Sequence, residues 1–133
     1  MRPVVLDSSV LLGLWDPDDV HHRAASAALI RHLSAGHRIV VPVTVLSEVL
    51  VGAFRTTPHA VRTVEGFLDD LVSEVRPVDR AVGRAAAQYC ADHPELRLAD
   101  ALVIATGRLV DAEEILTADK RWEKVDPRVR VVE

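Results

Sequence analysis

The sequence has little of several features that would point to a particular class of protein. Its 133 residues include one cysteine, so the chain cannot form an internal disulfide bond. Aromatic residues make up 4% of the chain, too few for a fold that stacks single-stranded nucleic acid on aromatic rings. The formal net charge is −4, which excludes binding to a polyanion through general basicity. A polyanionic ligand would need local basic residues or a bound cation.

Long apolar runs are also missing. No run approaches the roughly 18 residues of a membrane-spanning helix, and the apolar N-terminal stretch is interrupted by Asp7 and ended by Asp16, unlike a signal peptide. With Cys90 as the single thiol, we expect a soluble cytoplasmic protein without a membrane segment. Hydrophobic residues make up 49% of the chain and supply a core, and the length favours one domain over residues 1–133.

Short apolar runs alternate with helical patterns from end to end of the chain. This alternation predicts a three-layer α/β/α sandwich with a five-stranded, mainly parallel sheet. The expected strands cover residues 3–7, 38–42, 74–78, 114–118 and 128–132. The expected helices begin at Ser8 or Ser9 and then cover residues 20–35, 45–54, 58–71, 79–92 and 98–110.

Some expectations concern single positions in these helices. Ser8 or Ser9 is a candidate cap for the first helix, and Thr44 for the third. In the second helix, the expected buried positions are Ala24, Ala28, Ile30 and Leu33. The histidines show no zinc-ligand spacing, so His21, His22 and His32 are interpreted as surface residues.

Four carboxylates occupy positions that matter in such a sheet. Asp7 and Asp119 directly follow expected strands, and Glu48 lies one turn into a helix that follows another. Position alone is also compatible with a purely structural role for each acid, as a helix cap or as a solvated surface charge. However, ligands of open α/β sheets bind beyond the carboxyl ends of the strands, which is where these residues fall.

Asp100 raises a separate question, because its helix is apolar almost all the way round. Leu98, Ala101, Leu102, Ala105 and Leu109 form one stripe, and the neighbours of Asp100 on the other side are apolar as well. Such a helix is predicted to be buried. A buried carboxylate needs a cationic partner, a bound cation or a proton.

Together the four acids indicate one metal site. Clustered carboxylates repel unless a cation intervenes, and oxygen ligands without histidine or cysteine favour Mg²⁺ or Mn²⁺. One ion or two would fit four acids. Such a site suits phosphodiester hydrolysis, in which the ion orients a water molecule and offsets phosphate charge. The candidate RNA-backbone contacts are Arg55, Arg97, Lys120, Arg121 and Lys124, although position alone favours a solvated surface charge for each of them.

Four segments of the chain resemble the motifs of PIN-domain ribonucleases, and more narrowly of VapC toxins from bacterial toxin–antitoxin pairs. They read "VVLDSSVLLGL", "VTVLSEVLVGA", "LRLADALVIATG" and "ILTADKRW", and they span the chain in order. The first motif has "DSS" where "DTS" or "DTN" is commoner, which keeps a hydroxyl after Asp7. None of the four acids departs from the pattern.

The resemblance implies a five-stranded parallel α/β/α fold and an endoribonuclease dependent on Mg²⁺ or Mn²⁺. The implied metal ligands and catalytic residues are Asp7, Glu48, Asp100 and Asp119. Ser8 or Ser9 and Thr117 would support them. Hydrolysis by a metal-activated water would leave a 5′-phosphate and a 3′-hydroxyl. The resemblance also implies a homodimer that is neutralised by a VapB-like antitoxin.

Three alternatives from other classes share the α/β layout, but two of them need residues that this chain lacks. A catalytically silent binding module on the PIN scaffold would keep the acids without cleaving RNA. A Mg²⁺-binding receiver domain would need adjacent acids after the first strand, where this chain has Asp7-Ser8-Ser9. A haloacid-type phosphatase would need a second aspartate at position 9, which is serine.

Overall fold

The computed structural model describes residues 1–133 and contains one sheet of five strands, all parallel. The spatial order of the strands is β3-β2-β1-β4-β5. Their bounds are β1 (Val4–Leu6), β2 (Ile39–Pro42), β3 (Glu74–Arg76), β4 (Glu114–Thr117) and β5 (Val129–Val131). The sequence predicted these five strands, and the all-parallel sheet confirms the expected fold class.

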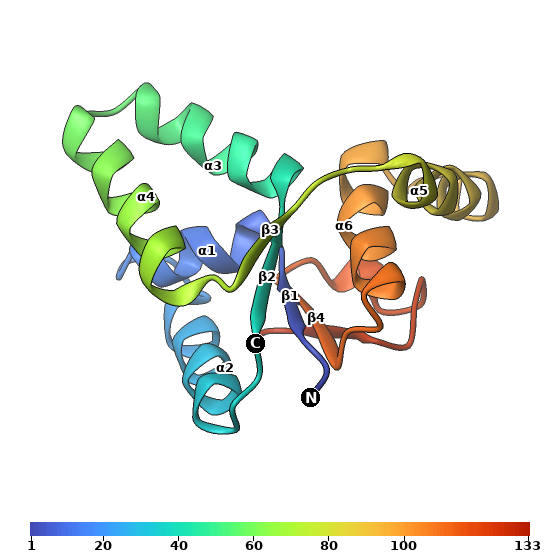
Figure 1. The fold of residues 1–133 in the computed structure, drawn as a ribbon, viewed down its shortest axis with the longest axis horizontal. Helices are drawn as coiled ribbons and strands as arrows, with labels where there is room; N and C mark the ends of the chain where they lie inside the picture. The colour runs from blue at the N-terminus through green and yellow to red at the C-terminus, as the bar shows by residue number, and fades with distance from the viewer.

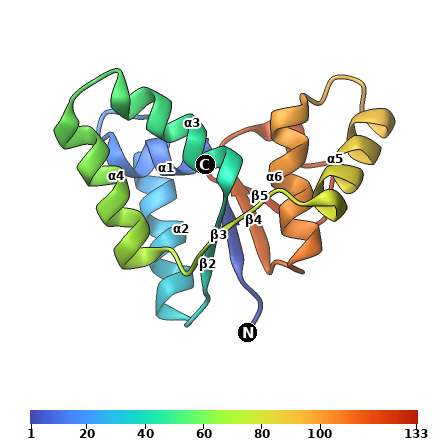
Figure 2. The same ribbon diagram turned by 45° about the horizontal axis from the view of Figure 1, so that its top comes forward.

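Six helices cover the two faces of this sheet (Figures 1 and 2). One side carries α1 (Ser8–Trp15), α2 (His22–Ser34), α3 (Val43–Phe54) and α4 (Pro58–Leu71), and the other carries α5 (Arg80–Asp92) and α6 (Leu98–Leu109). Helices on both faces are what a parallel sheet requires, because its crossover connections must pass over the faces. A short 3₁₀ helix, η1 (Lys120–Trp122), follows β4.

The core lies between the central strands and the helices on either side. All residues of β1 and β2 are buried, which explains why both strands read as continuous apolar runs rather than alternating ones. Helix α6 packs closely on β4, since a Cβ atom added at Gly107 would overlap the side chain of Ile115. None of the helices is long and apolar enough to cross a bilayer.

The second helix buries Ala28, as predicted, and partly buries Ala24, but the prediction is wrong for Ile30 and Leu33. Its buried residues are Ala25, Ala28, Leu29 and His32, whereas Ile30 is 63% exposed and Leu33 37% exposed. The expectation that His32 lies at the surface is wrong as well. Its Nε2 atom lies 2.9 Å from Oε1 of Glu114 at the start of β4. His32 can occupy the buried stripe of α2 because the carboxylate of Glu114 gives its ring nitrogen a polar partner.

Two predicted helix caps and the predicted burial of one helix need correction. Asp7 rather than a serine occupies the cap position of α1, and Pro42 rather than Thr44 occupies that of α3. Helix α6 is buried along its middle, but Leu98 and Leu109 at its ends are 59% and 41% exposed. An apolar stripe longer than the neighbouring sheet leaves its terminal residues without anything to cover them.

Candidate functional site

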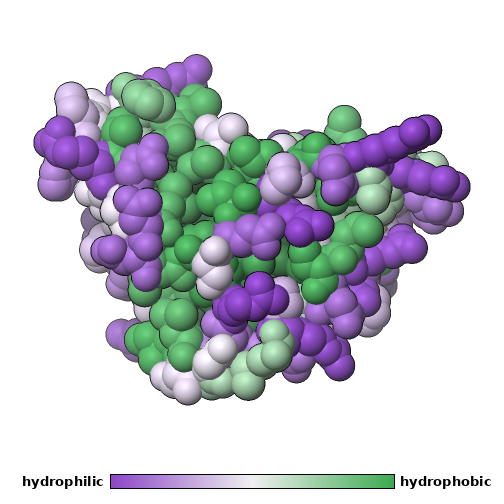
Figure 3. Space-filling view, viewed as in Figure 1, coloured by the Kyte–Doolittle hydropathy of each residue, from purple (hydrophilic) through white to green (hydrophobic).

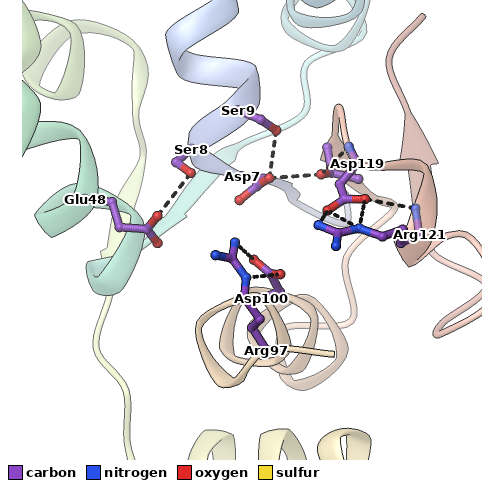
Figure 4. A network of polar contacts seen from close by, with 9 residues as sticks. Asp7, Ser8, Ser9, Glu48, Arg97, Asp100, Asp119 and Arg121 are labelled. Carbon is purple, nitrogen blue, oxygen red and sulfur yellow. Dashed lines mark hydrogen bonds and ion pairs between the residues drawn. The ribbon is translucent and has the colours of Figure 1, made fainter. Parts of the chain in front are cut away.

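The candidate site lies at the edge where the carboxyl ends of the strands meet. Asp7 follows β1 directly, and Asp119 follows β4 after Ala118. Glu48 comes from the second turn of α3, the helix that follows β2, and Asp100 from the first turn of α6. Figure 4 shows side chains from these four segments gathered around Asp7. The parallel sheet thus brings to one edge acids that are up to 112 positions apart in the sequence, the separation of Asp7 and Asp119, as the motif spacing predicted.

Asp7 is the most buried of the four acids, with 6% of its surface exposed. Two hydroxyl groups donate hydrogen bonds to its Oδ2 atom, from Ser9 at 2.7 Å and from Thr117 at 2.9 Å. Burial raises the pKa of Asp7, and the two hydroxyl groups oppose that rise. No cationic side chain pairs with this carboxylate in the structure.

The same hydroxyl groups tie two chain segments together. Ser9 Oγ accepts a hydrogen bond from the N–H of Ala118 at 3.0 Å, and Thr117 Oγ1 accepts one from the N–H of Asp119 at 3.1 Å. The start of α1 and the end of β4 are therefore held together through the hydrogen bonds of Ser9 and Thr117 around Asp7. The supporting role that the resemblance implied for Ser9 and Thr117 stays a prediction.

Glu48 lies on the opposite side of Asp7 from Asp119 in Figure 4. Its Oε2 atom accepts a long hydrogen bond, 3.4 Å, from Ser8 Oγ. Partial burial raises the pKa of Glu48, and the negative charges of Asp7 and Asp100 add to the rise. Asp7 and Asp100 therefore lie near enough to Glu48 for their charges to disfavour the ionised form of Glu48.

Two of the acids are paired with arginines from the same chain. Arg97 donates from Nε to Oδ2 of Asp100 at 3.2 Å and from Nη2 to Oδ1 at 3.4 Å. Arg121 donates from Nη2 to Oδ2 of Asp119 at 2.6 Å and from Nε to Oδ1 at 2.9 Å. The hydrogen bonds from Arg121 hold the pKa of Asp119 below its ordinary value. Both guanidinium groups are largely exposed, so each pair sits at the mouth of the site.

These pairs bear on whether the site could hold a cation. In this conformation no three carboxylate or imidazole side chains lie close enough together to coordinate one metal ion. The donor set nevertheless fits a hard cation, because it consists of oxygen atoms alone and leaves Asp7 and Glu48 without a cationic partner. Ligation by Asp100 and Asp119 would require both side chains to leave their arginines.

The structure separates the five basic candidates into two groups. Arg97 and Arg121 lie at the site itself, and Lys124 lines a cavity shared with Asp100. Lys120 instead pairs with Glu133 at 3.7 Å, and Arg55 lies at the exposed C-terminal end of α3. Only the first three are placed to approach a ligand at the acids.

Sequence reasoning overlooked the role of Arg97 and Arg121 as partners of the acids. The signal was present for Arg97, which precedes Asp100 by three positions at the start of a helix. Arg121 follows Asp119 by two positions in the short η1 turn. No periodic pattern predicts a pair of this second kind, because it depends on the turn geometry.

Comparisons with known proteins agree with this architecture. The structure resembles a toxin–antitoxin complex from Klebsiella pneumoniae, with a TM-score of 0.78, 20% sequence identity and coverage of 98% of each chain. It also resembles FitAcB from Neisseria gonorrhoeae, with a TM-score of 0.74, 19% identity and 95% coverage of each chain. VapC20 of Mycobacterium tuberculosis, a Sarcin-Ricin loop cleaving toxin, has a TM-score of 0.71 at 19% identity over 90% of this chain and 92% of its own.

No curated protein matches the sequence. Residues 4–127, however, match the family model described as PIN domain. That range contains all four acids and every strand except β5, whose residues 129–131 follow it. The chain therefore belongs to the PIN domain family.

Proposed function

We propose that this protein is a metal-dependent endoribonuclease, and that it acts as the toxin of a VapBC-like pair. The observation that carries the proposal is the meeting of Asp7, Glu48 and Asp100, whose charges are coupled although the residues come from three separate segments. Membership of the PIN domain family supports it, as does the fold shared with a toxin that cleaves the Sarcin-Ricin loop. Clustered carboxylates with raised pKa values are typical of functional sites.

The proposed ligands of a Mg²⁺ or Mn²⁺ ion are Asp7, Glu48, Asp100 and Asp119. When bound, the ion would supply Lewis-acid polarisation of the phosphate and of the attacking water. Ser9 and Thr117 hold Asp7 in one orientation, so that its Oδ1 atom stays free of these hydroxyl groups. Glu48, more exposed and with a raised pKa, is placed to accept a proton from the water.

Arg97 and Arg121 have a second proposed role, toward the RNA. A guanidinium group binds phosphate oxygens as readily as carboxylate oxygens, because both offer two acceptors to its planar fork. On release from the acids, the two exposed side chains would contact the RNA backbone at the site. This arrangement lets a protein with a net charge of −4 hold a polyanion locally.

We also propose a protein partner of the antitoxin kind. Solved relatives include toxin–antitoxin complexes, and one is described as VapBC bound to DNA. An apolar groove of about 710 Å³ lies between α1, α3 and α4, and Leu12, Trp15 and Val49 are among its lining residues. The groove therefore lies along the helix that also carries Glu48.

A homodimer belongs to the same proposal. Figure 3 shows apolar surface on the face between the α3–α4 helices and the α5–α6 helices. Over the chain as a whole, large apolar side chains that are exposed include Phe54 at 71%, Leu71 at 38% and Val78 at 37%. Sedimentation velocity of the purified protein would distinguish monomer from dimer.

A catalytically silent binding module is the second candidate function. One observation favours it, namely that no three acids are close enough to coordinate an ion in this conformation. The two candidates differ in metal binding and in turnover. Calorimetric titration with Mn²⁺, followed by an RNA cleavage assay, separates them.

The decisive experiment is cleavage of structured RNA by the purified protein with Mg²⁺ or Mn²⁺. Asp7→Asn and Asp100→Asn should each abolish cleavage, while Asp70→Asn on the exposed face of α4 should leave it unchanged. Circular dichroism would verify that all three variants fold. Full activity of Asp7→Asn, or undiminished activity in excess EDTA, would contradict the proposal.

A further inference from the structure

A second cavity opens directly beside the acids and has no role in the proposed chemistry. It has a volume of about 220 Å³ and lies between residues 93–100 and residues 121–125. The first segment leads into Asp100, and the second follows Asp119. Asp100 and Arg121 line both this cavity and the site. The cavity therefore adjoins the site through these two residues.

The size of the cavity limits what it can hold. Pockets for drug-sized ligands occupy roughly 300–1,000 Å³, whereas this cavity holds about 220 Å³. At the ~30 Å³ that a water molecule occupies in the liquid, the volume corresponds to a small cluster of waters. A single planar heterocycle matches this space, and a helix or a folded peptide segment does not.

The lining mixes opposite charges, which argues against a simple phosphate site. Glu95 and Asp100 supply acceptors, and Lys124 and Arg121 supply donors, with His93 beside them. Two carboxylates would repel a phosphate group. A nucleobase, by contrast, carries donors and acceptors along its edge and an apolar face on each side.

Trp122 provides an apolar wall of the cavity. Its side chain is 1% exposed and lines the cavity. The indole Nε1–H group has no hydrogen-bond partner in the structure. Buried donors are nearly always paired, so an unpaired one in a residue that lines the cavity is unusual.

We propose that this cavity is a subsite for one unpaired keto base of the RNA, uracil or guanine, next to the bond that is cleaved. The inference rests on the proposed ribonuclease function and names which base the site reads. A keto base offers a carbonyl oxygen to Lys124 and an adjacent ring N–H to Glu95. Cytosine and adenine have an amino group in place of that carbonyl and lack the ring N–H, so the same pair of side chains would leave them mismatched.

The first test measures binding without turnover. The Asp7→Asn variant, which should not cleave, is titrated with fluorescein-labelled oligouridine and oligocytidine of equal length, which differ only in keto against amino bases. We expect about tenfold tighter binding of oligouridine. Adding Glu95→Gln should bring the two affinities within about threefold, because an amide both donates and accepts. Lys124→Ala should weaken oligouridine binding more than oligocytidine binding.

Glu123→Gln is the matched control, since Glu123 precedes Lys124 but lines a different cavity with Arg130 and Glu133. This variant should keep the uracil preference. In the second test, the cleaved bond is mapped, and the bases on its two sides are exchanged between uracil and cytosine. Glu95→Gln should lower the ratio of kcat/KM for the two substrates by about tenfold through KM, with kcat within about twofold.

The outcomes separate this subsite from the proposed function. If the wild type cleaves RNA but Glu95→Gln and Lys124→Ala leave the base preference unchanged, the subsite proposal is wrong. The ribonuclease proposal is then unaffected. If the wild type cleaves no RNA, the ribonuclease proposal fails, and the binding test still decides the subsite. Equal affinity for oligouridine and oligocytidine overturns the subsite in either case.

Discussion

Arg121 holds Asp119 in a two-pronged ion pair, with Nη2 2.6 Å from Oδ2 and Nε 2.9 Å from Oδ1. The backbone N–H of Arg121 donates to the same carboxylate at 2.9 Å. One side chain therefore occupies both oxygen atoms of an acid that the proposed function assigns to a metal ion. Any cation that binds there must compete with a guanidinium group supplied by the chain itself.

We expect Arg121→Ala to increase the affinity of the protein for Mn²⁺, because Asp119 becomes free to turn toward the other acids. Isothermal titration calorimetry without RNA measures this directly. Arg62→Ala, on α4 and outside the site, is the control and should bind Mn²⁺ as the wild type does. Weaker Mn²⁺ binding by Arg121→Ala would show that Arg121 orders Asp119 for ligation instead.

Asp7→Asn should raise the melting temperature of the metal-free protein at neutral pH. Burial raises the pKa of Asp7 in the folded state above its ordinary value of 3.8, so the folded chain retains a proton that the unfolded chain has lost. Stability therefore falls as the pH rises from 3.8 through the raised pKa. Asparagine removes this cost and still accepts from Ser9 and Thr117 through its carbonyl oxygen.

Thermal unfolding with EDTA at pH 4 and at pH 8 measures this effect. The advantage of Asp7→Asn should be large at pH 8 and should shrink toward pH 4. Added Mg²⁺ should stabilise the wild type and not the variant, by mass action on the folded state. An advantage of the same size at both pH values would show that the charge of Asp7 is not its source.

Thr117→Val should destabilise the fold by about 1–3 kcal/mol, since it leaves a buried carboxylate with one donor fewer and the N–H of Asp119 without an acceptor. Urea unfolding gives the free energy. Thr106→Val is a matched control, because Thr106 is equally buried but donates only to a carbonyl of its own helix, that of Leu102 at 2.8 Å. We expect the control to cost about 0.5 kcal/mol or less.

Gly107→Ala should destabilise the protein by about 1–3 kcal/mol, because the new methyl group would overlap Ile115 and force α6 away from β4. Gly83→Ala is the control within α5, where an added Cβ atom meets no other atom. It should stabilise the protein by about 0.5–1 kcal/mol through helix propensity. Equal effects of the two substitutions in urea unfolding would contradict the packing of α6 on β4.

Local pattern in the chain was sufficient for the order of strands and helices and for the edge at which the acids meet. Runs such as Val4–Leu6 are apolar at every position, so they read as strands buried on both faces. Parallel strands all end at one edge of their sheet. An acid directly after such a run, as at Asp7, is therefore placed at that edge before any coordinates are known.

The tertiary structure decided which side chains meet, because meeting depends on partners that are distant in the sequence. His32 is buried rather than exposed because its ring nitrogen lies against the carboxylate of Glu114, the first residue of a strand that begins 82 positions later. Ile30 is exposed because the neighbouring elements cover the other face of α2. The pairing of Arg121 with Asp119 depends on the geometry of the η1 turn. Hydropathy along a chain records how apolar each position is, whereas burial and ion pairing are properties of two surfaces brought together by folding.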